Sequence, residues 1–137
     1  MSYQFAGFFT RPAVPLREFP ADAVAIQIGA PFLGTGIRFH SLIGKTPAVA
    51  DVLDLASKIG VAAAPQWIYL TYDCWGGEID FVYGFTSTDG VLSPPVEDSS
   101  WDSVEATYYI LMSRFGIGEE SARDFAPFTR GFWGEND

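Results

Sequence analysis

The sequence predicts an α+β fold: a single globular domain, residues 1–137, built on a mainly antiparallel sheet. Strand-like runs come first, a central β-hairpin at about residues 67–85 follows the first helical segment, and helical patterns come last. This order is typical of α+β domains and differs from the regular alternation of parallel α/β folds. The length of 137 residues is sufficient for one substantial core.

Three strand-like runs open the chain, at residues 3–10, 23–28 and 37–43. The glycines of the stretch 34–36 predict a turn before the third run. The first helix is expected at about residues 47–59, with Thr46 placed to cap its start and Gly60 directly after its end. Apolar residues recur within it at helical spacing, which predicts one buried stripe.

The hairpin carries the sharpest functional signal, because it sets carboxylates against each other. Gly76-Gly77 suits a tight turn, since glycine readily takes positive φ. A two-residue loop places Asp73 opposite Asp80 and Trp75 opposite Glu78, whereas a four-residue loop places Asp73 opposite Glu78. Facing carboxylates destabilise a sheet, so a cation, a basic side chain, a shifted pKa or solvation should compensate.

The same register predicts which side chains share a face. The apolar face is expected to hold Ile68, Leu70, Tyr72, Cys74, Ile79, Phe81, Tyr83 and Phe85. Tyr69 falls on the opposite face together with Asp73 and Asp80. The hairpin therefore presents an aromatic and acidic patch, and the indole of Trp75 at its tip either packs back or meets a partner.

Two helices are predicted near the C-terminus, at about residues 101–115 and 119–125. Ser99 or Ser100 can cap the first of them, and Gly116 ends it. Its buried face is expected to hold Trp101, Val104, Tyr108, Leu111, Met112 and Phe115. These elements complete the α+β pattern.

Negative charge is concentrated in the second half of the chain. Residues 1–68 hold four acidic and five basic side chains, whereas residues 69–137 hold thirteen acidic and three basic ones, and the net charge is −9. Nucleic acid and anionic membranes are therefore disfavoured as partners. A basic protein surface or a cation would be attracted, and the alternative is a solvated acidic face that keeps the protein soluble.

No motif in the chain indicates a catalytic, metal or cofactor site. The only histidine, His40, and the only cysteine, Cys74, cannot build a histidine and cysteine zinc site, and Gly44-Lys45-Thr46 lacks the first glycine of a phosphate loop. We therefore expect no metal and no cofactor. The absence of a signal-peptide pattern and of a long apolar run indicates a cytoplasmic protein.

These observations favour a non-enzymatic protein-binding module. Its predicted partner-binding residues are Tyr69, Asp73, Trp75, Glu78 and Asp80. Two alternatives remain: an enzyme or small-molecule-binding protein with an aromatic-lined pocket that uses Asp73 and Asp80 with Arg38 or His40, and a homodimer whose seam takes the aromatic side chains.

In size, acidity and lack of catalytic motifs, the chain resembles the small acidic α+β immunity proteins that neutralise bacterial toxins. The resemblance implies a bacterial, immunity-type or regulatory protein that binds a basic partner.

Overall fold

The computed structural model describes residues 2–11, 15, 21–28, 34–75 and 78–123. The strands in this part are β1 (Ser2–Arg11), β2 (Ala23–Ile28), β3 (Gly34–Phe39), β4 (Gln66–Trp75), β5 (Glu78–Thr88), β6 (Val91–Leu92) and β7 (Val96–Asp98). The helices are α1 (Val49–Ile59), α2 (Val104–Arg114) and α3 (Glu119–Arg123), with short 3-10 turns η1 (His40–Leu42) and η2 (Val61–Ala63).

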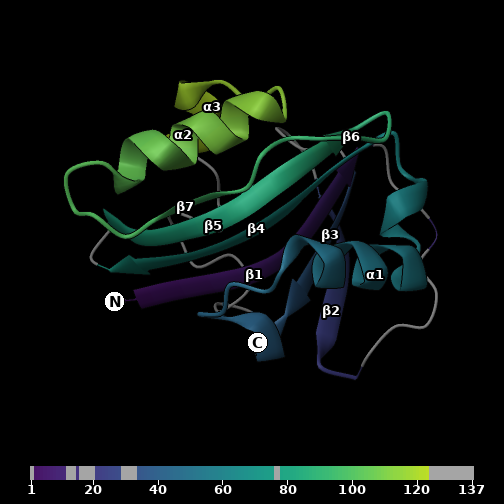
Figure 1. Cartoon of the computed structure of the whole chain (residues 1–137). Coiled ribbons are helices and arrows are strands. Elements are labelled where there is room, and N and C mark those ends of the chain that lie inside the picture. The colour runs from purple at the N-terminus through teal and green to yellow at the C-terminus, as the bar shows by residue number, and fades with distance from the viewer. Residues whose placement is uncertain (1, 12–14, 16–20, 29–33, 76–77, 124–137) are drawn as a thin grey trace.

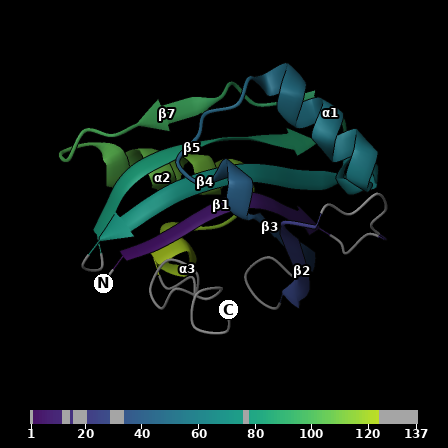
Figure 2. The same ribbon diagram turned by 90° about the horizontal axis from the view of Figure 1, so that it is seen from below.

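The strands form one antiparallel sheet in the order β2-β3-β1-β4-β5-β6, and β7 also pairs with β5 (Figure 1). The α+β fold with a largely antiparallel sheet and a long hairpin, β4–β5, is therefore confirmed. Helices cover both faces of the sheet: α2 and α3 lie on one face, and α1 lies on the other (Figures 1 and 2). This double cover decides which side chains of the hairpin can reach the surface.

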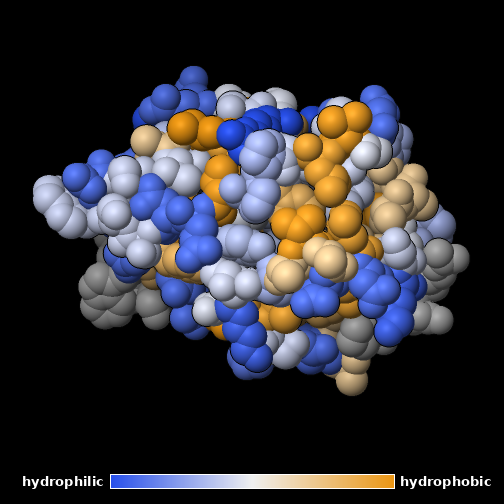
Figure 3. All heavy atoms as spheres, in the orientation of Figure 1, coloured by the Kyte–Doolittle hydropathy of each residue, from blue (hydrophilic) through white to orange (hydrophobic). Residues whose placement is uncertain are grey.

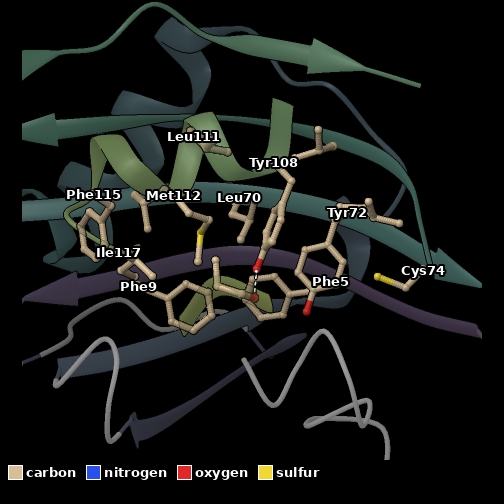
Figure 4. Packing of buried hydrophobic residues seen from close by; sticks show 14 of the residues in the cluster. Phe5, Phe9, Leu70, Tyr72, Cys74, Tyr108, Leu111, Met112, Phe115 and Ile117 are labelled. Carbon is tan, nitrogen blue, oxygen red and sulfur yellow. Dashed lines mark hydrogen bonds between the residues drawn. The ribbon is translucent and has the colours of Figure 1, made fainter. Parts of the chain in front are cut away.

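The core beneath α2 is rich in aromatic rings. Figure 4 shows Phe5 and Phe9 of β1 and Tyr72 of β4 facing the apolar side of α2. The rings of Phe5 and Phe9 are stacked with centroids 5.1 Å apart. The hydroxyl of Tyr108 on α2 donates a hydrogen bond to the carbonyl of Ala122 over 3.0 Å, which ties α3 to the same layer.

The second core lies beneath α1. Three apolar side chains one turn apart on this helix, Val52, Ala56 and Ile59, are fully or almost fully buried in the same cluster as Tyr69 and Phe85. The helix ends at Gly60, which has φ 98° and takes the left-handed conformation expected of a glycine cap.

Gly84 of β5 shows how closely α2 packs on the sheet. A Cβ atom at this position would lie 2.2 Å from the carbonyl oxygen of Tyr69 and 3.0 Å from Cδ2 of Leu111. Only glycine fits between the neighbouring strand and the helix.

The structure corrects the predicted boundaries in the first half. The stretch 34–36, expected to be a turn, is the start of β3, which is held between β1 and β2; residues 40–42, expected to continue the strand, form η1. Pairing on both sides has overridden the turn tendency of two glycines. Helix α1 begins at Val49 after Ala48, and Thr46 therefore lies outside the helix rather than at its cap.

The second helix also begins later than expected. Residues 101–103 form a turn, Ser103 occupies the N-cap position, and the helix proper runs from Val104 to Arg114. Trp101, expected in the buried face, is 92% exposed. The other five side chains predicted for that face are buried. Of the predicted third helix, residues 124 and 125 lie outside the described part of the chain.

Candidate functional site

The hairpin register differs from the predicted one over most of its length. At the tip, Trp75 pairs with Glu78, as expected from a two-residue loop. An irregularity between Asp73 and Cys74 then shifts the register by one residue, so that Asp73 lies opposite Phe81. The predicted Asp73/Asp80 pair is therefore wrong, because Asp80 is the extra residue of a β-bulge.

The bulge also changes the faces. Phe81, Tyr83 and Phe85 were expected beside Leu70 and its same-face neighbours on β4, but they pack on the α1 side of the sheet. Leu70 and those neighbours belong to the core beneath α2. A one-residue shift moves a whole strand's side chains to the other face, and both faces here have a helix to receive them.

The structure brings only some of the predicted partner-binding residues to the surface. Tyr69 is 0% exposed and lies in the core beneath α1, so it does not belong to an exposed patch. Glu78 and Asp80 are exposed and Asp73 is partly buried. For Trp75 the structure describes the backbone pairing alone, and its side chain lies outside the described part.

The charge of Asp80 still affects the pKa of Asp73 across the bulge. Burial raises the pKa of the Asp73 carboxyl, and the negative charge of Asp80 raises it further, whereas a hydrogen bond with the Gln4 side chain opposes the shift. Oδ1 of Asp73 is buried and has no hydrogen-bond partner among the described residues. The side chain is therefore held in a setting that disfavours its charge.

Two further unpartnered polar groups line β4 on the same face. The hydroxyls of Tyr69 and Thr71 are buried, and no hydrogen-bond partner is found for either within the part of the chain that the structure describes. Alternate residues of a strand share a face, so Tyr69, Thr71 and Asp73 form a row. The hydroxyl of the neighbouring Tyr83 is satisfied, since it donates to the carbonyl of Pro47 over 2.5 Å.

The residues of the alternative catalytic site do not converge. Arg38 follows Ile37, which packs beneath α1, so Arg38 lies on the α2 face. Asp73 precedes Cys74, which packs beneath α2, so Asp73 lies on the α1 face. The sheet separates the two, and His40 is exposed on η1. Burial raises the pKa of the Cys74 thiol to about 12, which leaves it unreactive at neutral pH.

A second acidic and aromatic surface, which no sequence pattern indicated, lies on the outer side of α2 and α3. A shallow hollow of about 520 Å³ is lined by Asp102, Glu105, Ala106, Tyr109, Ile110 and Glu119. We call these six residues the α2–α3 hollow. Ile110 is 50% exposed, and the exposed Trp101 precedes the helix at the Asp102 end. Figure 3 shows hydrophobic atoms in patches between hydrophilic side chains over these helices.

One cation of the chain contacts this hollow. Nη2 of Arg123 lies 2.8 Å from Oε1 of Glu119, and Nε donates to the hydroxyl of Tyr109 over 3.4 Å. The guanidinium carbon lies 5.9 Å from the centroid of the Tyr109 ring. The Tyr109 hydroxyl in turn donates to Oε1 of Glu105 over 2.8 Å. The hydroxyl of Tyr109 thus connects the guanidinium of Arg123 to the carboxylate of Glu105.

Another acidic residue nearby has a structural role. Asp98 accepts hydrogen bonds from the hydroxyl of Thr107 at 2.6 Å, the hydroxyl of Ser103 at 2.8 Å and the backbone N–H of Ser100 at 2.8 Å. These bonds, that of Thr107 first, lower the pKa of Asp98. The carboxylate fixes the turn that carries Trp101 into solvent.

Comparison of the chain with protein-family models, with curated proteins and with solved structures gave no match. Among the described residues, no helix has the length and apolarity needed to cross a membrane, and no group of three or more histidine, cysteine, aspartate or glutamate side chains is arranged to hold a metal ion.

Proposed function

We propose that the chain is a protein-binding module that holds a basic segment of a partner protein in the α2–α3 hollow. The observation that carries this proposal is the combination, in one concave surface, of three carboxylates with an exposed isoleucine and a tyrosine ring. Apolar and aromatic side chains supply contact area, and carboxylates select a positively charged partner.

The excess of carboxylates around the α2–α3 hollow favours a basic binding partner. Asp102, Glu105 and Glu119 line the hollow, and the basic side chain in contact with it, among the described residues, is Arg123. A partner that brings further positive charge relieves the repulsion between these carboxylates. Trp101, 92% exposed beside Asp102, is placed to act as an anchor, since tryptophan is enriched among the residues that dominate binding energy.

The exposed carboxylates at the start of β5 add to the negative electrostatic potential around the α2–α3 hollow. The end of β4, the start of β5 and the turn that precedes α2 lie at one end of the molecule in both ribbon views (Figures 1 and 2). The exposed Glu78 and Asp80 therefore belong to the end of the molecule that carries Trp101 and Asp102. In this proposal the hairpin carboxylates steer the partner, and the α2–α3 hollow holds it.

The size and acidity of the chain are in keeping with a cytoplasmic immunity-type or regulatory protein, and this assignment is part of the proposal. A regulatory module of this kind needs no catalytic group, and it gains from a strong negative field because charge complementarity speeds association.

The test is a titration of the full chain with a decapeptide of alternating arginine and glycine. The Asp102→Lys/Glu105→Lys variant should bind the peptide at least tenfold more weakly. The matched control, Asp51→Lys/Asp54→Lys, makes the same charge change on α1, where both aspartates are exposed. Equal losses for the two variants would mean that net charge alone attracts the peptide, and the proposed site would be wrong.

A further inference from the structure

The α2–α3 hollow already shows how it holds a guanidinium group. Arg123 lies against the ring of Tyr109, bonds to its hydroxyl and pairs with Glu119 at 2.8 Å. This combination of a ring contact and a carboxylate bond suits the planar guanidinium of arginine better than the compact ammonium of lysine. The chain therefore displays, within one molecule, the chemistry that a partner would use.

The contact made by Arg123 is easily exchanged. The side chains of Arg123 and Glu119 are 57% and 62% exposed, and the two residues are one helical turn apart on α3. Exposed ion pairs of this kind are weak and are screened by salt. An arginine from a partner can replace Arg123 without breaking any buried contact.

The hollow has room and polarity for such an arginine. Ala106 and Ile110 offer apolar surface for its methylene stem, while Asp102 and Glu105 face its charged end. The carboxylates that line the hollow outnumber the contacting cation of α3, so an incoming guanidinium finds acceptors even while Arg123 is being displaced.

We infer that the partner presents an arginine, rather than a lysine, to Tyr109, and that Arg123 occupies this place in the free protein as an internal competitor. The inference rests on the proposed function and adds its specificity and its regulation. Removal of a side chain that contacts the partner would weaken binding. Removal of Arg123, a competitor, should instead strengthen binding of the partner's arginine.

The experiment uses the full chain and two probes, decapeptides that alternate glycine with arginine or with lysine. Wild type should bind the arginine peptide about three- to fivefold more tightly than the lysine peptide, the margin expected of an exposed cation–π contact. Arg123→Ala should tighten arginine binding about threefold, whereas Arg123→Lys should tighten it less. Tyr109→Leu should bring the two peptides to equal affinity. Thermal melting of each variant checks that α3 remains in place.

The outcomes separate the two proposals. If Arg123→Ala binds the arginine peptide more weakly or equally, or if wild type does not distinguish the peptides, the inference is overturned. The proposed function still stands in that case, provided that Asp102→Lys/Glu105→Lys weakens binding at least tenfold and the α1 control does not. If neither peptide binds wild type, or if the two double variants behave alike, both proposals fail.

Discussion

Thr71 offers the clearest test of the energetic reasoning. Its side chain is 0% exposed in the middle of β4, and its hydroxyl has no hydrogen-bond partner among the described residues. A buried hydroxyl without a partner costs about 1–3 kcal/mol of stability. Thr71→Val replaces the hydroxyl by a methyl group of similar size, which adds about 0.8 kcal/mol of hydrophobic stabilisation. We expect the free energy of unfolding to rise by about 2 kcal/mol.

The matched control is Thr10→Val on the neighbouring strand β1. Thr10 is equally buried, but its Oγ1 accepts a hydrogen bond from the backbone N–H of Thr35 over 3.2 Å. Loss of that acceptor should lower the free energy of unfolding by about 1–2 kcal/mol. Two chemically identical substitutions are thus expected to act in opposite directions.

The assay is urea denaturation at neutral pH with tryptophan fluorescence as the signal, supported by thermal melting. Thr71→Val should move the urea midpoint upward with an unchanged slope and raise Tm by about 6 °C. A less stable Thr71→Val would refute the reasoning, because it would show that the hydroxyl is bonded in solution. Tyr69→Phe repeats the test at the next position of the row.

The site and the core lead to four further predictions. Because the pKa of the Asp73 carboxyl is raised in the folded state, Asp73 contributes most to stability below its ordinary pKa of 3.8, and this contribution is lost as the pH rises. Asp73→Asn should therefore be more stable than wild type toward urea at neutral pH, and the difference in stability should close in acid. The pKa of Asp98 is lowered, so Asp98→Asn should be less stable than wild type toward urea at neutral pH. A change in stability of the same sign for both variants would contradict the electrostatic argument. Gly84→Ala should cost about 1–3 kcal/mol by overpacking against the backbone of β4 at Tyr69 and against Leu111 of α2, and an unchanged melting curve would show that these neighbours can move apart. Trp101→Ala should leave Tm nearly unchanged while weakening arginine-peptide binding at least threefold; unchanged affinity would remove Trp101 from the interface.

The parts of the fold that depend on local pattern were predictable. The strand at residues 23–28, the end of the first helix at Gly60 and the hairpin around its two glycines follow from spacing and turn chemistry. Such features need only a few neighbouring residues. They account for the correct fold class.

The hairpin register was not predictable from the turn, because a β-bulge at Asp80 changes it after the pairs Trp75/Glu78 and Cys74/Ile79. Turn geometry fixes the first pairs alone, and burial decides the rest. The nearly continuous apolar run of residues 81–85 was the available signal. Strands buried on both faces read this way, and the run indicated that the hairpin has no free face.

The α2–α3 hollow could not be predicted from the sequence for a related reason. Glu105/Tyr109 and Glu119/Arg123 each have the i,i+4 spacing of helical neighbours, which the sequence displays. The contact between Tyr109 and Arg123 joins two helices, and no periodicity within one helix foretells it. The exposure of Trp101 likewise depends on where α2 begins.

The acidic excess of the second half is not one uniform solubilising coat. Asp98 is used internally to hold a turn, and Asp73 is constrained beside Gln4 within the sheet. Asp102 and Glu105, in contrast, line a concave surface with apolar and aromatic neighbours. A coat that serves solubility alone requires carboxylates, but it does not require a hollow, an exposed tryptophan or an arginine held against a tyrosine ring. Those three features together favour recognition of a basic partner over simple solvation.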